Sequence, residues 1–269
     1  MLQNLPMTSE SYSRYSRHLL LEGFGKQGQD RLSSGRVLIV GAGGLGSPCA
    51  LYLAAAGVGC IGLADGDIVS LSNLQRQVIH YTTDIGREKV ESAAEKMRCL
   101  NPDIEVRYYP TFLTEDNALK MVGEYDFIVD CTDSYASKYL VNDACIMAGK
   151  PFCCGGVIRY GGQVMTHVPG SACYRCLFPE PPEENDVETC STVGVLGTAV
   201  GIIGCIQATE AIKYLTNTGT LLTNCLMTFD TWGMECQRMA LQRDKACPIC
   251  GETPSNHTLR EYSFMPCRQ

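Results

Sequence analysis

The chain has 269 residues, with 22 Lys and Arg against 29 Asp and Glu, and 16 cysteines. The formal charge of −7 excludes a protein that coats nucleic acid or a membrane surface with a broad basic patch, so we expect neither partner. A hydrophobic content of 45% excludes extensive disorder, and the length allows one large α/β domain or two small ones.

The first residues and the cysteines bear on location. Met1–Ser16 has no apolar core segment of the kind found in signal peptides. The longest mostly apolar run, Val193–Ala208, is too short and too rich in glycine to span a membrane. In a chain of this length without a signal peptide, we expect the cysteines to be free thiols or metal ligands rather than disulfides. We therefore expect a cytoplasmic protein.

After N-terminal helices within residues 1–34, including one at Glu10–Leu21, strands and helices alternate. The predicted strands are Arg36–Val40, Cys60–Ala64, Ile104–Tyr109, Phe127–Cys131 and Phe152–Val157, and the helices between them are Ser47–Gly57, Gly86–Leu100, Glu115–Val122 and Tyr135–Ala148. Short apolar runs rich in Val and Ile are typical of strands buried on both faces. The alternation predicts a Rossmann-like, doubly wound α/β fold with a mainly parallel sheet over residues 35–157.

Beyond Val157 the regular alternation of strands and helices ends, and we expect antiparallel strands to extend the sheet. The predicted elements are two strands within Val157–Thr166 joined by a glycine-containing turn, an exposed acidic loop at Pro179–Thr189, one long helix at Thr192–Leu215, and strands at Cys225–Asp230 and Glu235–Ala240. We treat the chain as a single domain whose second half covers residues 158–250 and whose tail covers residues 251–269.

A glycine-rich loop follows the first predicted strand. Gly41, Gly43 and Gly46 form a G-x-G-x-x-G pattern between that strand and a helix. Such glycines let a phosphate approach backbone amides at a helix N-terminus, where partial positive charge favours an anion. Asp65 closes the second strand, where a carboxylate can accept hydrogen bonds from ribose hydroxyls. The pattern predicts nucleotide binding and leaves open whether the nucleotide is ATP or a dinucleotide.

Charged residues downstream favour ATP. A triphosphate attacked at its α-phosphorus needs cations on the departing pyrophosphate and a carboxylate for Mg²⁺. Arg76, Lys89 and Asp133 supply that set, and Asn73 and Gln77 lie beside them in the sequence. Taken singly, Arg76 and Lys89 could be solvated surface charges, but the carboxyl ends of parallel strands are where such sheets bind ligands.

Ser70–Gln77 (SLSNLQRQ) closely resembles the signature of the ThiF/MoeB/HesA family, the bacterial relatives of ubiquitin-activating enzymes. The resemblance extends over about Tyr12 to Cys250. Further matching segments are Val40–Gly46, Asp65 with Asp67, Gly86–Lys89, Asp130–Asp133, Tyr174–Cys176 and the paired CxxC motifs. It implies an enzyme that adenylates the C-terminal glycine carboxylate of a small β-grasp sulfur-carrier protein ending in Gly-Gly, as in thiamine or molybdopterin synthesis.

The resemblance also implies roles for single residues. Asp65 would hold the ribose, and Gly44 with its neighbours the adenylate and phosphates. Asn73, Arg76 and Lys89 would bind the triphosphate, and Asp133 would bind Mg²⁺. Arg17 matches an N-terminal arginine that reaches the ATP of a partner subunit, which implies a functional homodimer; without the resemblance it would be an ordinary surface arginine on a helix.

Two pairs of cysteines stand far apart in the chain, Cys173 with Cys176 and Cys247 with Cys250. Four thiolates satisfy tetrahedral Zn²⁺ completely, whereas Pro248 within the second pair would also suit a redox dithiol. The family resemblance implies the zinc site, which would tether the C-terminal segment to the rest of the fold.

Cys190 lies where the acidic loop meets the long predicted helix. A thiol near a helix N-terminus can become nucleophilic. The resemblance implies acyl or sulfur transfer there, and the alternative is a small apolar filler. Most other cysteines fall in predicted core elements, namely Cys49, Cys60, Cys99, Cys131, Cys145, Cys153, Cys154, Cys205 and Cys225, so we expect them to be buried.

Three alternatives are open, the first of which has the same fold. One is a dehydratase that forms cyclic threonylcarbamoyladenosine on tRNA, which the acidic charge disfavours. Another is an NAD-dependent oxidoreductase, which the cations beyond the glycine loop disfavour, as does the lack of a His–acid pattern typical of dehydrogenases. The third, a non-catalytic binding module, conflicts with the presence of Arg17, Arg76, Lys89 and Asp133 together. No rhodanese-like segment is found in the sequence, so we expect a separate sulfur donor.

Overall fold

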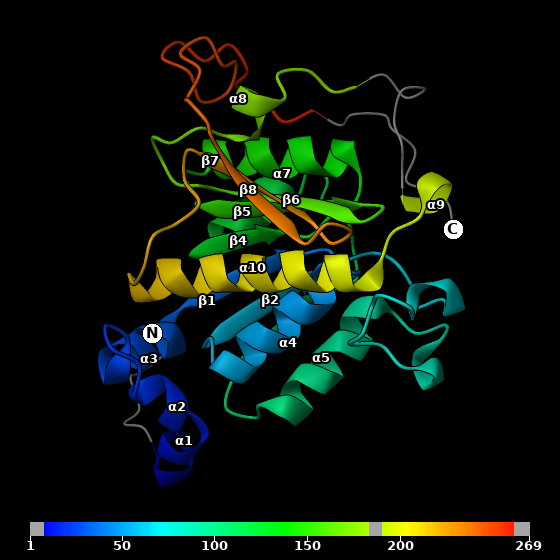
Figure 1. The fold of residues 1–269 in the computed structure, drawn as a ribbon, viewed down its shortest axis with the longest axis vertical. Coiled ribbons are helices and arrows are strands. Elements are labelled where there is room, and N and C mark those ends of the chain that lie inside the picture. Colours follow the sequence, from blue (N-terminus) through cyan, green and yellow to red (C-terminus); the bar gives the residue numbers. More distant parts are fainter. Residues whose placement is uncertain (1–7, 183–189, 261–269) are drawn as a thin grey trace.

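The computed structural model describes residues 8–182 and 190–260, and it centres on a mixed eight-stranded sheet (Figure 1). The strands are β1 (Arg36–Val40), β2 (Cys60–Ala64), β3 (Glu105–Tyr109), β4 (Phe127–Asp130), β5 (Phe152–Ile158), β6 (Gly161–His167), β7 (Cys225–Asp230) and β8 (Glu235–Ala240). Their order is β3-β2-β1-β4-β5-β6-β7-β8. The first five are parallel and the last three antiparallel, which confirms the predicted fold class.

Helices cover both faces of the parallel part. The α-helices are α1 (Ser9–Arg14), α2 (Ser16–Leu19), α3 (Gly25–Ser34), α4 (Gly46–Ala56), α5 (Lys89–Leu100), α6 (Ala118–Gly123), α7 (Tyr135–Met147), α8 (Tyr174–Leu177), α9 (Cys190–Val193) and α10 (Gly197–Thr216), and the 3-10 turns are η1 (Leu71–Asn73) and η2 (Thr82–Asp84). Helix α10 packs on α4 and on β4, β5 and β6, while α7 packs on β4 and β5. Figure 1 shows the sheet between α7 above and α10 and α4 below.

Strand β1 explains why this part of the sequence is so apolar. Val37 and Ile39 join the core on the side of α4 and α10, whereas Leu38 and Val40 join the core on the side of α7. A strand that faces helices on both sides needs apolar residues at successive positions rather than at alternate ones. The prediction of strands buried on both faces is confirmed.

The long helix predicted at Thr192–Leu215 is wrong at its beginning. Gly194 adopts φ +81, and the chain breaks into α9 and α10. Arg159 donates its N–H to the Gly194 carbonyl at 2.9 Å and accepts the Leu196 N–H at 2.8 Å. Those bonds to the β5–β6 turn replace the helical ones. Similarly, the N-terminal helix predicted at Glu10–Leu21 is divided into α1 and α2 at Tyr15.

The turn between β5 and β6 also differs from its prediction. Arg159, at φ +54, and Tyr160 form the turn, and the glycines lie in β6 itself. A Cβ at Gly162 would come within 2.4 Å of Ile203 on α10. The glycine is therefore required by close helix–strand packing rather than by the turn.

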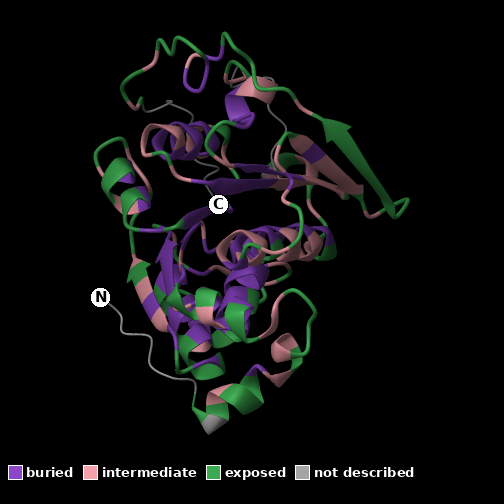
Figure 2. Cartoon of the chain, turned by 90° about the vertical axis from the view of Figure 1, so that its left-hand side faces the viewer, coloured by how far each residue is buried: buried purple, intermediate pink, exposed green. Residues whose placement is uncertain are grey.

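The antiparallel end is more exposed than the parallel part. All six residues of β8 are exposed, and Figure 2 shows this edge of the sheet in green beside a buried interior. Within the described ranges, no helix is both long and apolar enough to cross a membrane. The predicted acidic loop and the tail lie partly outside the described residues, since 183–189 and 261–269 are not described.

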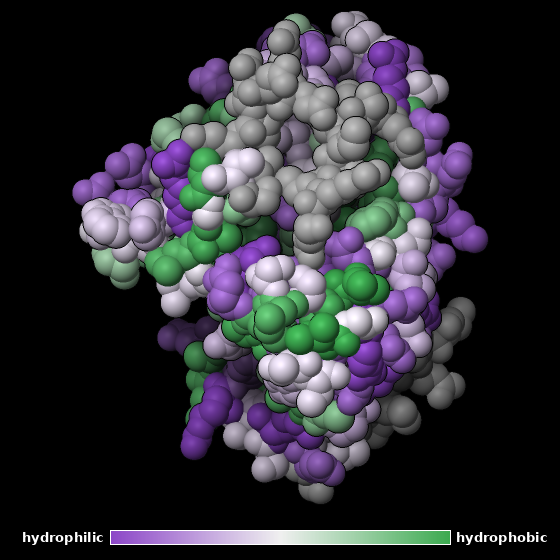
Figure 3. All heavy atoms as spheres, turned by 90° about the vertical axis from the view of Figure 1, so that its right-hand side faces the viewer, coloured by the Kyte–Doolittle hydropathy of each residue, from purple (hydrophilic) through white to green (hydrophobic). Residues whose placement is uncertain are grey.

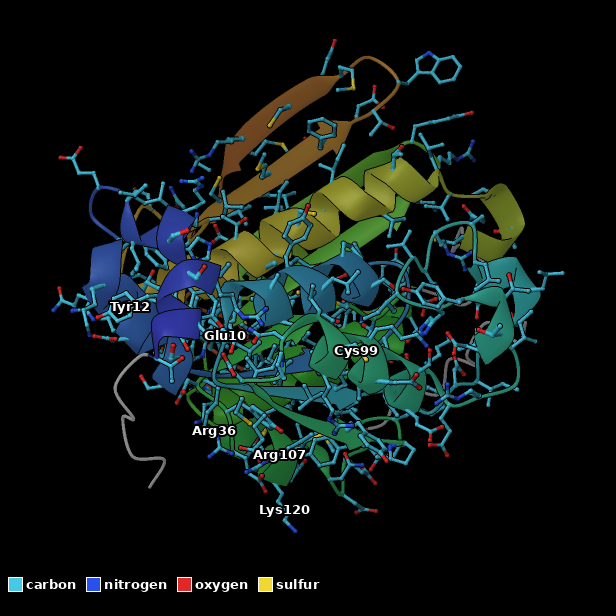
Figure 4. The ribbon with its side chains drawn as sticks, turned by 90° about the horizontal axis from the view of Figure 1, so that it is seen from below. Glu10, Tyr12, Arg36, Cys99, Arg107 and Lys120 are labelled. Carbon is cyan, nitrogen blue, oxygen red and sulfur yellow. The ribbon has the colours of Figure 1, made fainter. Side chains whose placement is uncertain are left out.

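Six of the nine predicted core cysteines are buried, two are half-buried and one is exposed. Cys99 is exposed on α5 (Figure 4), because it lies on the side of that helix that faces away from the sheet. The prediction for Cys99 is therefore wrong, and Cys205 and Cys225 are only half-buried.

Candidate nucleotide-binding site

A cavity of about 670 Å³ opens at the carboxyl ends of the parallel strands. The glycine loop after β1, the carboxylates after β2 and the turn after β4 all line it. Because β1 lies between β2 and β4, with its crossovers running to opposite faces, the loops separate there and leave a crevice. Figure 3 views the molecule from the side on which α9 lies in Figure 1, and hydrophobic side chains gather on that face.

The glycines of the loop have two different roles: three of them line the cavity, and one allows the tight turn into α4. Gly41, Gly43 and Gly44 line the cavity, and Gly41 adopts φ +98. A Cβ at Gly44 would lie 2.7 Å from Val200 on α10, and one at Gly46 would lie 2.0 Å from the Gly41 carbonyl oxygen. Gly46 therefore permits the tight turn into α4 and does not line the cavity.

Asp65 is buried at the end of β2 and holds two backbone groups. Its Oδ2 accepts the Ala42 N–H at 2.7 Å, and its Oδ1 accepts the Asp67 N–H at 2.8 Å. Burial raises the pKa of the Asp65 carboxyl, while the nearby Lys89 charge acts in the opposite direction. The carboxylate lines the cavity and also braces the glycine loop.

The cations and the acid predicted for a triphosphate meet at this cavity. Arg76, Lys89 and Asp133 all line it. The Lys89 side chain is 3% exposed and pairs with Asp67 at 2.7 Å, while Arg76 Nη1 donates to the Ser72 carbonyl at 3.1 Å. Asp133 is exposed after β4. The charges come from three separate segments of the chain, with Lys89 at the first residue of α5, so only the fold brings them together.

Besides Gly46, two residues predicted for the nucleotide site lie outside the cavity lining in this chain. Asn73 is fully buried, and its Oδ1 accepts the Ser70 N–H at 3.1 Å, so it shapes the loop that carries Arg76. Arg17 is exposed on α2, at the opposite end of the molecule from α9 (Figure 1). The roles of both residues in ATP binding stay predictions.

The cavity lining includes Gln77, which the sequence predicted for the nucleotide site, and Lys138, which it did not. Gln77 is buried, lines the cavity, and has a side-chain oxygen without a hydrogen-bond partner among the described residues. Lys138 on α7 also lines the cavity; its ammonium donates to the Gly155 carbonyl at 2.5 Å and lies 3.3 Å from Asp130. Burial by itself would lower the pKa of Lys138, but Asp130 and Cys154 raise it overall. A lysine inside a predicted helix carries no local signal that it faces a site.

The cavity continues from the nucleotide loop along the antiparallel strands. Gly156, Gly161 and Gly162 line this arm together with Phe229. Cys190 lines it as well, half-buried at the start of α9, and its Sγ lies 3.2 Å from the Val157 carbonyl oxygen. The sequence motifs did not reveal this glycine-lined arm, because its glycines belong to two strands paired in register.

The four cysteines of the paired motifs form one cluster, with all sulfur atoms within 4.8 Å of one another. Cys173 Sγ lies 3.8 Å from Cys176 Sγ and 3.7 Å from Cys247 Sγ, and Cys176 Sγ lies 3.4 Å from Cys250 Sγ. A tetrahedral ion with bonds of about 2.3 Å requires sulfur separations of about 3.8 Å. The donor set and its spacing therefore fit a metal ion, and Asp244 donates its N–H to Cys176 Sγ at 3.4 Å.

A buried ion pair anchors the first cysteine pair to α7. Arg175 donates to both carboxylate oxygens of Asp143, at 2.8 and 2.9 Å, and its guanidinium lies 4.6 Å from the centre of the Tyr139 ring. Asn142 accepts the Tyr174 N–H at 2.9 Å. The cluster is thus attached to the sheet through α7 and α8, at a distance from the nucleotide loop.

Residues 15–249 match the model of the ThiF family. The chain belongs to the ThiF family. This confirms the resemblance expected from the sequence, and the match includes the glycine loop, the loop that carries Arg76 and three of the four paired cysteines, since it ends one residue before Cys250.

Several relatives of this ThiF family chain are named as adenylyltransferases or as an activating enzyme. It is 44% identical to the SAMP-activating enzyme E1 of Haloferax volcanii, covering 92% of each chain, and 40% identical to the sulfur carrier protein adenylyltransferase of Thermus thermophilus, covering 95% of this chain and 96% of that one. It is also 44% identical to the adenylyltransferase and sulfurtransferase MOCS3 of Mus musculus over 95% of its own length, but it spans only 56% of that relative.

Solved structures agree on the ThiF family fold. E. coli MccB with ATP superimposes with a TM-score of 0.78 at 23% identity, covering 92% of this chain and 75% of that one. At this identity the likeness establishes the fold alone.

Proposed function

We propose that this chain catalyses ATP-dependent adenylation of the C-terminal glycine carboxylate of a β-grasp sulfur-carrier protein ending in Gly-Gly. The observation that carries the proposal is one cavity that joins a glycine loop, Arg76, Lys89 and Asp133 to an arm where Gly156, Gly161 and Gly162 are among the lining residues. The first part suits a nucleoside triphosphate, and the arm suits an extended chain without side chains. The names of two full-length relatives support the same activity.

The proposed chemistry follows from the charges. A carboxylate is a poor acyl electrophile because its oxygen is a bad leaving group. When the carrier carboxylate oxygen attacks the α-phosphorus of ATP, a C–O–P link forms and the bond to pyrophosphate breaks. Negative charge then grows on the pyrophosphate, where Arg76 and Lys89 would stabilise it. The acyl group, now esterified to AMP, is open to a sulfur nucleophile.

Asp133 would hold Mg²⁺ in this reaction. It presents an exposed carboxylate to the cavity, and carboxylate oxygens are ligands that Mg²⁺ prefers. An ion bound there would neutralise charge on the triphosphate. Asp65 would hold the ribose, as its position at the end of β2 favours.

A homodimer would complete the site. Arg17 lies outside the cavity of its own chain, so its proposed contact with ATP requires a partner subunit. Apolar side chains exposed around the Arg76 loop, among them Leu71 and Val78, would suit such an interface. An arginine supplied by a partner can contribute about 10³–10⁵ to the rate of related phosphoryl transfers.

The four-cysteine cluster would hold a structural Zn²⁺. Four thiolates leave no open coordination position, so the ion would contribute stability to the segment after β8 rather than chemistry. Residues 158–250 would then combine carrier binding with this zinc site.

Cys190 is proposed to act after adenylation. Its thiolate would attack the acyl carbon and form a thioester as AMP leaves, or it would receive sulfane sulfur from a donor persulfide, whose thiol would leave. Cys190 faces the same cavity as the glycine-lined arm, which supports a role after the adenylate forms. Sulfur would come from a separate donor, in thiamine or molybdopterin synthesis, and we place the reaction in the cytoplasm.

Exchange between labelled pyrophosphate and ATP tests the proposal. We expect exchange that depends on a carrier ending in Gly-Gly and disappears when the last glycine is removed. NAD binding without any carrier-dependent exchange would instead favour the oxidoreductase. Activity on tRNA carrying threonylcarbamoyladenosine would favour the dehydratase. No contact in the described structure specifically favours either alternative.

A further inference from the structure

His80 is buried directly beneath the glycine loop, and no sequence motif assigned it a role. It is 4% exposed and does not line the cavity. Its Nε2 lies 3.0 Å from the Ala42 carbonyl oxygen, and its Nδ1 lies 2.9 Å from Ser92 Oγ on α5. The imidazole thus joins a helix of the scaffold to the loop that faces the nucleotide.

The partners of His80 determine its tautomer. A carbonyl oxygen can only accept a hydrogen bond, so Nε2 must carry the proton. In the neutral ring, Nδ1 then accepts from the Ser92 hydroxyl, whose oxygen in turn accepts from Lys96 Nζ at 3.1 Å. Burial lowers the pKa of His80, which favours the neutral ring with its proton on Nε2.

The contact with Ala42 has a consequence for the next residue. A trans peptide group is planar, so the Ala42 carbonyl and the Gly43 N–H point in opposite directions. Because His80 binds the carbonyl from below, the Gly43 N–H points away from His80. On the preceding peptide, the Ala42 N–H is bound by Asp65 at 2.7 Å. Both peptide groups of Ala42 are therefore oriented by buried side chains.

We propose that His80 is a positioning residue that orients the Ala42–Gly43 peptide so that the Gly43 N–H is offered to a bound phosphate. The inference rests on the proposed nucleotide binding at this cavity. Without the imidazole, the peptide can rotate and present its carbonyl oxygen instead, which would repel a phosphate. Binding of ATP should then weaken because the loop must reorder first.

The test measures binding of ATP with Mg²⁺ to the full chain, without carrier, by titration calorimetry. For His80→Leu we expect a loss of affinity on the order of tenfold, the effect of one hydrogen bond. His80→Gln can place an N–H near the Ala42 carbonyl and should restore affinity to within about threefold of the original chain. His167→Leu is the matched control, since His167 is also buried, contacts the Ala172 carbonyl at 3.2 Å, and does not line the cavity.

Unchanged affinity in His80→Leu, or an equal loss in His167→Leu, would overturn the proposal. If His80→Leu does not fold, Ser92→Ala still tests it, because loss of the hydroxyl should weaken ATP binding about two- to threefold. A ¹⁵N spectrum should also show the proton of His80 on Nε2, and a proton on Nδ1 alone would contradict the geometry. If ATP binds but no carrier supports exchange, the proposed function fails while this inference stands.

Discussion

The parallel and antiparallel parts of the sheet obtain their stability in different ways. Strands β1, β2 and β4 are almost wholly buried between two layers of helices, whereas β8 is exposed along its full length. The C-terminal segment has a small apolar cluster of its own, built around the four cysteines and Ile249. The comparison teaches that the nucleotide loops are supported by a large apolar core, whereas the C-terminal segment packs on a small cluster around four thiols that could hold a metal ion.

Removal of metal from the four-cysteine cluster should have the largest effect on local stability. We expect the effect to be confined to the C-terminal segment. With a chelator, or in Cys247→Ser, we expect the segment around residues 244–260 to lose protection from hydrogen exchange while β1 keeps it. Structural zinc contributes about 10–16 kcal/mol of apparent binding free energy in small model domains. Metal analysis should find about one Zn per chain, and Cys236→Ser, an exposed thiol on β8, is the control. Equal loss of protection in β1 would contradict a local role.

Truncation of a side chain should lower the free energy of unfolding far more in the buried parallel part of the sheet than at its exposed antiparallel edge. Phe127 on β4 is fully buried, and its ring centre lies 5.1 Å from that of Tyr214 on α10. We expect Phe127→Ala to lower the free energy of unfolding by about 3–5 kcal/mol. Met239→Ala on the exposed edge should change it by less than about 0.5 kcal/mol. Urea denaturation measures both, and similar values would show that the edge is more constrained than its exposure indicates.

Loss of Asp133 should affect activity without affecting stability. Since the side chain is exposed, we expect Asp133→Ala to keep the wild-type melting temperature. Carrier-dependent pyrophosphate exchange should fall by about 10²–10³ through loss of transition-state stabilisation. Asp103→Ala, an exposed acid outside the cavity, is the control. An unchanged exchange rate would remove Asp133 from the site.

Acid should produce the smallest effect, through two buried histidines, one beside the glycine loop and one at the end of β6. Burial lowers the pKa of His80 and of His167 below the usual 6.5. Near and below pH 6.5 the unfolded chain therefore binds more protons at these two histidines than the folded chain does. Their contribution to the free energy of unfolding is complete above about pH 6.5 and decreases as the pH falls below that value. Urea midpoints at pH 7.5 and 5.5 should differ more for the original chain than for the double variant His80→Gln with His167→Gln. The two chains share the metal cluster, so its own acid sensitivity cancels in the comparison.

The sequence predicted the parallel half well because its signals are local. Val37–Val40 must be apolar to face two helix layers, and the glycine loop must permit a tight turn, so each feature is visible within a few residues. Predictions were weaker where distant contacts override local preference. The helix expected from Thr192 is interrupted because Gly194 and Leu196 bond to Arg159, which lies more than thirty residues earlier.

The sequence by itself determined which chemistry is available: a glycine loop after a buried strand, cations and acids after neighbouring strands, and two cysteine pairs. Only the tertiary structure decided which of these groups meet. It placed Arg76, Lys89 and Asp133 around one cavity and left Asn73 and Arg17 outside its lining. It also added Lys138 to that lining and placed His80 behind the glycine loop, in contact with the Ala42 carbonyl. The physical reason is that local propensity acts over a few residues, whereas a site is assembled by strand order and packing between segments far apart in the chain.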